Sequence, residues 1–262
     1  MRFLTILFAA AFTLSATAQS YNELCDSGKA LCEKGNYREA ATRYARAADV
    51  ARDKSNRIFA LSGEGYAHYM AGDIKKAAES YAQALALDST SVPLLAQRGN
   101  ILLEQDSLQA AIACYNNALM LEPDNRDILF CRAYAHARAG LYKEGKKDYL
   151  KILSKNSNDE KARLGLALLY QKEGSVNESL MLLEALIEEN PRNPELYMAR
   201  CNIEREQGQH ELALMDIEKA IELAPHDAAY HLTKADILEK LGKRDAAQKS
   251  RNKALRINSA PK

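Results

Sequence analysis

Small and glycine positions recur along this chain with a period of 34 residues, and they dominate its pattern of polar and apolar sites. Counted from Tyr21, the eighth and twentieth residues of each block are small, and the fifteenth is glycine in every block but one. The eighth places hold Gly28, Gly65, Gly99, Ala133, Ala167, Cys201 and Ala235, and the twentieth hold Ala40, Ala77, Ala111, Gly145, Ser179, Ala213 and Ala247. Two helices approach closely only where both carry small side chains, and glycine accommodates the turn that ends a helix. Each block is therefore predicted to be a helix, a tight turn and a second helix.

The predicted blocks fill nearly the whole chain. They span residues 21–54, 58–91, 92–125, 126–159, 160–193, 194–227 and 228–261, with a three-residue insert, Ser55 to Arg57, after the first block. Because every block is used by the repeat, no stretch remains for a separate catalytic domain. In the last block Arg251 stands where the first four blocks carry a tyrosine ring, which gives this helix a charged outer side. We expect that block to cap the array, since the ends of stacked repeats need a polar face.

Aromatic and proline positions complete the pattern. The twenty-fourth place holds Tyr44, Tyr81, Tyr115 and Tyr149, and Pro123, Pro191 and Pro225 follow three of the second helices. Small, glycine, small, aromatic and proline residues at these offsets resemble the tetratricopeptide repeat (TPR), whose period is also 34. The resemblance implies an all-α fold, a right-handed superhelical solenoid of seven TPR helix-turn-helix hairpins. The family's frequent early tryptophan is absent, and the last three blocks depart most from the family pattern.

The resemblance also implies a groove lined by the first helix of each hairpin. In the family, the second, fifth, ninth and twelfth residues of a block point into this groove. The candidates at these places are Phe59, Tyr66, Tyr69, Asn100, Phe130, Tyr134 and Asn202. Aromatic rings offer a large contact area at little cost in rotamer entropy, and family members use asparagine at the ninth place to bind an extended ligand's backbone. The alternative is that the rings pack against neighbouring repeats and the asparagines are merely solvated.

The charge of the chain is nearly balanced, with 36 Lys and Arg against 35 Asp and Glu. Nucleic-acid binders usually carry a strongly basic domain, so a nucleic-acid partner is not expected. The charge is nevertheless zoned, because the fourth and seventh blocks are net basic and the fifth and sixth are net acidic. These alternating basic and acidic blocks could attract a partner or hold two copies of the chain together, or they could be ordinary solvated helix faces. A homo-oligomer is therefore an open alternative.

The amino terminus has the features of a secretory signal peptide at residues 1–18. A basic start at Arg2 precedes an apolar run that ends in Ala16, Thr17 and Ala18, a small-x-small cleavage pattern. An uncleaved membrane anchor is the alternative, although the apolar run is short for a spanning helix. The cleaved chain would be exported to the periplasm or cell envelope, or secreted, and would not be an integral membrane protein.

Histidine and cysteine residues do not form a recognisable catalytic or metal pattern. The sequence has no HExxH or paired Cys/His spacing and no nucleotide-binding glycine loop, so we expect no metal and no cofactor. Cys25 and Cys32 are too far apart on one helix to form a disulfide. Cys114 and Cys131 fall on adjoining predicted helices, where either a disulfide or two thiols is possible.

These features predict a non-catalytic protein-interaction scaffold or assembly factor of the cell envelope, which binds a partner protein or peptide in the concave groove. The alternative is a glycan or small-ligand module that uses the groove aromatics for stacking. Some TPR proteins grip a terminal carboxylate with two lysines, two asparagines and an arginine spread over three blocks. Lys29 and Asn100 are not arranged as that clamp requires, so a chaperone role of that kind is not expected.

Overall fold

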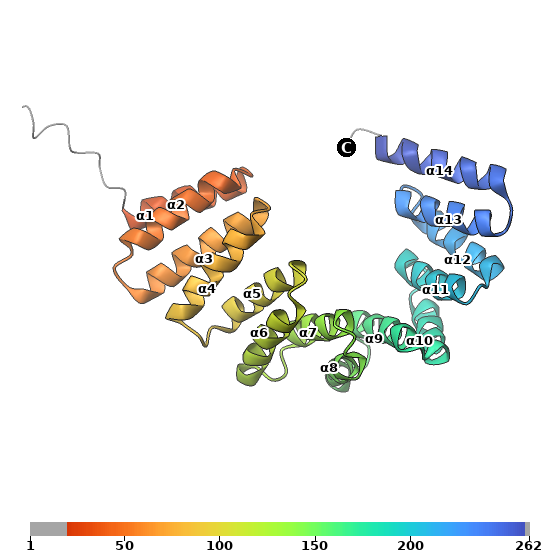
Figure 1. Cartoon of the computed structure of the whole chain (residues 1–262), viewed down its shortest axis with the longest axis horizontal. Helices are drawn as coiled ribbons and strands as arrows, with labels where there is room; N and C mark the ends of the chain where they lie inside the picture. The colour runs from red at the N-terminus through yellow and green to blue at the C-terminus, as the bar shows by residue number, and fades with distance from the viewer. Residues whose placement is uncertain (1–19, 260–262) are drawn as a thin grey trace, which may run out of the picture. The chain divides into compact units, whose positions relative to one another are not determined.

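The computed structural model describes residues 20–259, which form fourteen helices joined by short turns (Figure 1). The helices are α1 (Tyr21–Glu33), α2 (Tyr37–Val50), α3 (Lys54–Met70), α4 (Ile74–Leu87), α5 (Val92–Glu104), α6 (Leu108–Leu121), α7 (Arg126–Arg138), α8 (Tyr142–Lys155), α9 (Glu160–Glu173), α10 (Val176–Glu189), α11 (Pro194–Glu206), α12 (His210–Leu223), α13 (Ala228–Lys240) and α14 (Arg244–Ser259). This range contains no strand, and the expected all-α class is confirmed. The predicted signal peptide lies outside the described residues.

The chain divides between Ile128 and Leu129, inside α7, into two compact units. The first unit contains α1 to α6 and the first turn of α7, and the second contains the rest of α7 and α8 to α14. Within each unit, consecutive helices pack side by side in chain order (Figure 1). Each unit is therefore a stack of helical hairpins whose core runs between the helices along the stack.

The small residues at the eighth and twentieth places are the points where the two helices of a hairpin touch. The Ser179 hydroxyl on α10 donates a hydrogen bond to the Ala167 carbonyl oxygen on α9, 2.7 Å away. At Gly145, an added Cβ would lie only 3.0 Å from the carbonyl oxygen of Ala133. These pairs join the twentieth place of one helix to the eighth place of its partner, so the predicted contact is confirmed in the fourth and fifth hairpins.

The tyrosine rings at the twenty-fourth place rest on glycine backbone. The pairs are Tyr44 with Gly28 and Gly63, Tyr81 with Gly65, Tyr115 with Gly99, and Tyr149 with Gly165. Gly63 and Gly165 lie at the sixth place of the following repeat, so a ring can face either its own repeat or the next one. Each ring thus fills space that the missing side chain of at least one glycine leaves.

The three inserted residues lengthen a helix. They extend α3 at its beginning, and this helix has 17 residues. The Asp53 carboxylate accepts a hydrogen bond from the backbone N–H of Asn56 at 2.8 Å, which satisfies a donor in the first turn. The sequence placed the insert between two blocks, and the structure assigns it to the first helix of the second hairpin.

The turns between paired helices require a left-handed residue. The six glycines of the fifteenth place have φ between 73° and 89°. In the third block Asp106 occupies this place, with φ 58°. Only glycine reaches this region without a steric cost from Cβ. The structure therefore confirms the turn that the glycine pattern predicts, and it places a strained residue in the third hairpin.

Replacing Asp106 with glycine is expected to raise the free energy of unfolding by about 0.5–1 kcal/mol, because it removes the left-handed strain. Urea unfolding followed by circular dichroism measures the change. The reverse exchange at the equivalent turn, Gly72→Asp, is the matched control and should lower stability by a similar amount. Equal stability of Asp106→Gly and the original chain would contradict the strain assignment.

Two hairpins carry a buried ion pair between the seventh and twenty-third places. Arg132 donates to both carboxylate oxygens of Asp148 at 2.9 and 2.6 Å, and Arg200 donates to Asp216 at 2.7 and 2.8 Å. Both carboxylates are buried. Each pair joins the two helices of one hairpin, so it holds α7 to α8 or α11 to α12.

Glu204 lies buried beside the second of these pairs. Burial, followed by the nearby negative charge of Asp216, raises its pKa to about 7. One of its carboxylate oxygens, Oε2, is buried without a hydrogen-bond partner. A buried carboxylate in this position is costly when ionised, and retaining its proton removes that cost.

This carboxyl group makes stability fall as the pH rises. Between about pH 4.5 and 7 the unfolded chain loses the Glu204 proton while the folded chain keeps it, so the folded state binds more protons and is destabilised progressively, by about 3 kcal/mol in all. Glu204→Gln is expected to remove this dependence. Denaturant unfolding at pH 4.5, 6 and 7.5 measures the free energy of unfolding. If this free energy changed with pH equally in the variant and the original chain, Glu204 would not be the source of the dependence.

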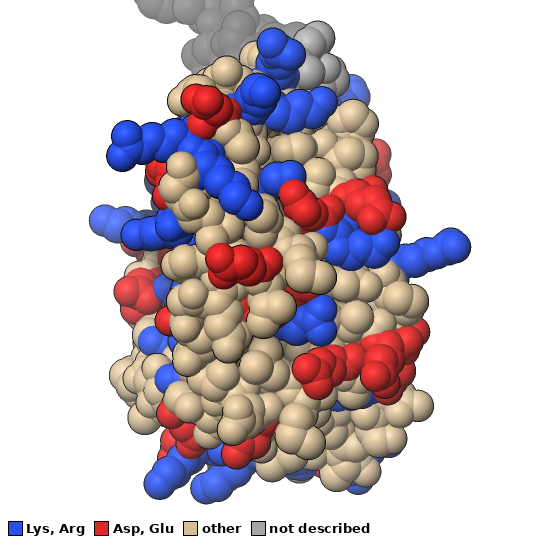
Figure 2. Space-filling view, turned by 90° about the vertical axis from the view of Figure 1, so that its right-hand side faces the viewer, with Lys and Arg blue, Asp and Glu red and all other residues tan. Residues whose placement is uncertain are grey.

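The last hairpin presents a charged outer surface. Arg251 pairs with Glu239 of α13 at 2.6 Å, and the Gln248 amide donates to Asn252 at 3.0 Å. Figure 2 shows Lys and Arg gathered at the top of the molecule, over α14. These contacts support the expected cap at the end of the array. None of the helices in residues 20–259 is both long enough and apolar enough to cross a membrane.

Candidate partner-binding cleft

The second unit contains a cleft of about 650 Å³, here called the second-unit cleft. Its walls are the first helices α7, α9, α11 and α13, with Tyr149 of α8 and His210 of α12 also contributing. The lining residues are Tyr134, Ala137, Arg138, Tyr149, Gly165, Leu168, Leu169, Gln171, Lys172, Asn202, Arg205, Glu206, His210, Asp236, Ile237 and Lys240. A volume of this size lies in the range typical of ligand-binding pockets.

The lining follows the repeat. The ninth places supply Tyr134, Leu168, Asn202 and Asp236, the twelfth supply Ala137, Gln171 and Arg205, and the thirteenth supply Arg138, Lys172, Glu206 and Lys240. Because consecutive hairpins stack in the same orientation, each offset forms a row across the cleft. The cleft is thus a property of four successive repeats, and its chemistry changes from one repeat to the next.

Two of the predicted groove residues, Tyr134 and Asn202, line this cleft together. The Tyr134 side chain is 49% exposed, and the Asn202 amide oxygen accepts a long hydrogen bond from Arg205 at 3.4 Å. Phe130 is not among the lining residues. Its ring packs edge-on against Tyr149, with 5.6 Å between the ring centroids, so it takes part in packing between helices.

The other four predicted residues lie in the first unit. Phe59 is 59% exposed and lines a smaller hollow of about 330 Å³ with Pro93 and Leu94, between α3 and α5. Tyr66 is 47% exposed on α3. Both rings therefore have surface available for a partner.

Tyr69 and Asn100 have partners within the chain. The Tyr69 hydroxyl donates to the Glu104 carboxylate at 2.5 Å, and this bond raises the pKa of Tyr69. Asn100 accepts a hydrogen bond from the buried Tyr115 hydroxyl at 2.8 Å. Tyr69 and Glu104 occupy the twelfth and thirteenth places of successive repeats, which are also the places of the Gln171–Glu206 hydrogen bond at 2.7 Å. The same kind of contact therefore links adjacent first helices within each unit, once in the first and once in the second.

Sequence reasoning missed most of the cleft. The predicted groove residues lie mainly in the second to fourth repeats, whereas the ninth and twelfth places of later repeats hold Leu168, Gln171 and Arg205. These three residues could have been predicted by applying the same repeat places to the fifth and sixth repeats. No offset in the family pattern pointed to the thirteenth-place residues Lys172 and Lys240, which only the packing of the helices revealed.

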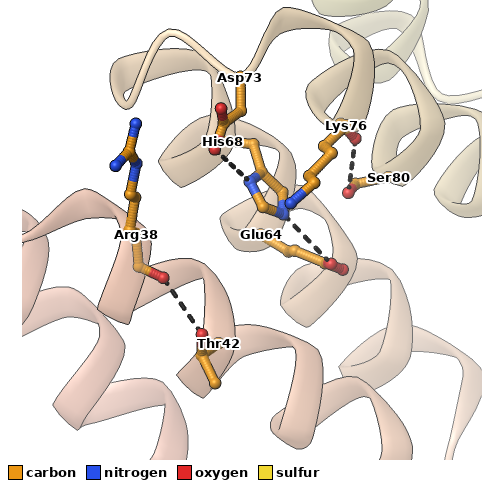
Figure 3. A network of polar contacts seen from close by, with 7 residues as sticks. All are labelled: Arg38, Thr42, Glu64, His68, Asp73, Lys76 and Ser80. Carbon is orange, nitrogen blue, oxygen red and sulfur yellow. Dashed lines mark hydrogen bonds and ion pairs between the residues drawn. The ribbon is translucent and has the colours of Figure 1, made fainter.

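A polar network in the second hairpin also contains titratable side chains (Figure 3). His68 on α3 lies between Glu64 of the same helix, with Nε2 and Oε1 3.7 Å apart, and Asp73 before α4, with Nδ1 and Oδ2 3.8 Å apart. Burial and the positive charge of Lys76 lower the pKa of His68, against the opposing effect of Asp73. The network joins two packed helices, and the arrangement is that of a structural contact.

Cysteine, histidine and carboxylate side chains are spread over residues 20–259. In that range no three His, Cys, Asp or Glu side chains are grouped as metal ligands. The five cysteines all lie in the described part, and they are thiols with no disulfide between them. Burial raises the pKa of Cys201 to about 12, which keeps this thiol protonated.

Three family models match the chain. One described as tetratricopeptide repeat matches residues 126–259, just over half of the chain, and another of the same description matches residues 25–92. A third, described as TPR repeat, matches residues 99–140. The stacked hairpins and the cleft between their first helices define a helical-repeat protein. The chain belongs to the tetratricopeptide repeat family.

Solved structures share this fold. A tetratricopeptide repeat protein from Parabacteroides merdae is 26% identical with a TM-score of 0.82, covering 91% of this chain and 93% of that chain. PilW, a widely conserved type IV pilus biogenesis factor, is 18% identical with a TM-score of 0.63 over 74% of this chain and 90% of its own. PilF of Pseudomonas aeruginosa is 14% identical with a TM-score of 0.59 over 79% and 95%. No curated protein sequence matches this chain.

Proposed function

We propose that this protein is a non-catalytic scaffold or assembly factor that binds a partner protein or peptide through the first helices of its hairpins. The observation that carries the proposal is the second-unit cleft, where four successive repeats supply the same helix positions to one hollow. A cleft built from repeats presents an elongated row of side chains, which suits an extended chain segment. Exposed aromatic rings such as Tyr134 provide anchors for it.

We further infer that the partner is met in the cell envelope or outside the cell. The support is the sequence of residues 1–18, which has the charge, apolar run and small-residue ending of a signal peptide. Comparing the mass of the chain purified from its own host with the mass after removal of residues 1–18 tests the export step. Retention of the full mass would contradict cleavage.

Loss of the exposed rings is expected to weaken partner binding at least tenfold without changing helicity. The variant is Tyr66→Ala with Tyr134→Ala, one ring from each unit, because buried aromatic anchors dominate many interfaces. Affinity capture from envelope extracts, followed by titration of the captured partner, measures the loss.

The matched control is Met120→Ala with Met215→Ala, which removes two largely exposed apolar side chains from second helices, again one in each unit. It should retain binding. Equal binding by both double variants would contradict the groove assignment. Capture of envelope polysaccharide in place of a protein, lost in the tyrosine variant, would support the glycan alternative.

A further inference from the structure

The second-unit cleft has one apolar end and a group of basic side chains. At the α7 and α9 end, Tyr134 and Leu168 are 49% and 40% exposed. Towards α11 and α13 the ninth-place row becomes polar, with Asn202 and then Asp236. Large apolar side chains exposed inside a hollow provide contact area for an apolar group, so this end suits a single apolar anchor.

The carboxylates of the cleft are already engaged within the chain. Glu206 accepts a hydrogen bond from Gln171 at 2.7 Å. Asp236 lies 3.7 Å from the guanidinium of Arg251, which belongs to the last helix. The charge of Asp236 is therefore partly compensated before any partner arrives, and Glu206 has one carboxylate oxygen occupied by a neutral amide.

The basic side chains of the cleft are placed differently. Lys172 and Lys240 are exposed at the thirteenth places of the fifth and seventh repeats, and in the described residues neither ammonium group has a carboxylate within 4.0 Å. Arg205 between them contacts only the neutral Asn202 amide among the hydrogen bonds of its side chain. Lys172, Arg205 and Lys240 thus offer positive charge from three successive repeats, and none of the three is ion-paired within the described residues.

We propose that the second-unit cleft binds an acidic, extended peptide segment of a partner protein, with one large apolar side chain against Tyr134 and Leu168 and carboxylates facing Lys172, Arg205 and Lys240. This inference rests on the proposed function and specifies the chemistry of its partner. Cations spread over three repeats match carboxylates spread along a chain, whereas a compact anion could reach only one or two of them. Charge complementarity selects the acidic segment, and the apolar end sets its direction in the cleft.

A displayed library of random twelve-residue peptides, selected on the purified chain, tests this proposal directly. The expected result is enrichment of peptides that combine several Asp or Glu residues with one Leu, Phe or Trp. Their affinity should fall at least tenfold between 50 and 300 mM salt, since interactions between accessible charges are screened. Enrichment of basic peptides, or of peptides without acidic residues, would overturn the proposal.

A charge-reversal pair locates the binding site. Lys172→Glu with Lys240→Glu should weaken the selected peptides at least tenfold. Lys147→Glu with Lys249→Glu is the matched control, because it changes the net charge equally through two exposed lysines on second helices outside the cleft. Circular dichroism checks that both variants remain folded. Similar losses in both variants would show unspecific attraction and would overturn the assignment to the cleft.

The apolar end is tested separately with Leu168→Ser, which should weaken the same peptides about fivefold or more while leaving their salt dependence unchanged. The outcomes also separate this proposal from the function it rests on. Neutral apolar peptides that bind the original chain and are lost in Tyr134→Ala would retain the groove function and reject the acidic partner. Absence of any peptide that competes at the cleft would reject both.

Discussion

Replacing Asp148 with alanine is expected to lower the free energy of unfolding by about 3–5 kcal/mol at neutral pH, because it leaves the Arg132 guanidinium without its carboxylate between α7 and α8. The carboxylate is buried and bonded at 2.9 and 2.6 Å. His136 also lies beside it, with Nδ1 3.3 Å from Oδ2. Chemical unfolding at pH 7, followed by circular dichroism, measures the loss.

The chain itself offers the control for this prediction. In the fifth repeat the same two places hold Leu166 and Leu182, so the hairpin accepts an apolar pair there. Arg132→Leu with Asp148→Leu should therefore recover most of the stability lost in Asp148→Ala, since a well-packed apolar pair can replace a buried ion pair at little cost. A double variant as unstable as the single one would contradict this interpretation.

The pH dependence of the same site has a defined sign. Burial by itself raises the pKa of Asp148, but the two hydrogen bonds from Arg132 and the close approach of His136 outweigh it and hold the pKa below its usual value. The folded state thus favours the ionised form. This stabilisation is present above about pH 4 and is lost as the pH falls through the lowered folded-state pKa. The destabilisation by Asp148→Ala should accordingly shrink in acid.

Replacing Gly99 with valine is expected to cost about 3 kcal/mol, because the new side chain would overlap the Tyr115 ring. A Cβ at this position lies 2.5 Å from Tyr115 Cε1, and the ring is fully buried. The ring is also held by its hydrogen bond to Asn100, so it has little freedom to move aside. Urea unfolding again provides the measurement.

A second substitution tests the cause. Gly99→Val combined with Tyr115→Leu should be more stable than Gly99→Val alone, as the sixth and fifth repeats use Ile217 and Leu183 at the ring's place. Both of these side chains are fully buried, which shows that the place can be filled by an aliphatic residue. If the stability losses of Gly99→Val and Tyr115→Leu simply added in the double variant, overlap with the Tyr115 ring would not be the reason that Gly99→Val is unstable.

The repeat pattern predicted the hairpins because their geometry is local. The two helices of a hairpin are separated by one short turn, so the residues that must be small, such as Ala167 and Ser179, stand at a constant spacing. The glycine turn follows the same logic, and even its exception, Asp106, keeps the left-handed backbone. The extension of α3 by the insert was not predicted, because a three-residue insert can join either neighbouring helix.

The candidate site was predicted less well than the fold. Tyr134 and Asn202 share the second-unit cleft, as their ninth-place position suggested. Phe130 and Asn100 occupy groove places as well, but the first packs against Tyr149 and the second accepts from Tyr115. An offset within a helix tells which side of the helix a residue occupies, and it does not tell which neighbour meets that side.

The sequence by itself determined the helices, their pairing and the turns, since each depends on contacts between residues fewer than 34 positions apart whose types recur in every repeat. Only the tertiary structure decided where the repeats leave a hollow and which charges in it remain without partners. Lys172 and Lys240 are separated by two repeats along the chain and come to one cleft through the stacking of α9, α11 and α13. Stacking depends on the summed volumes of side chains between hairpins, and no single position in the sequence records that sum.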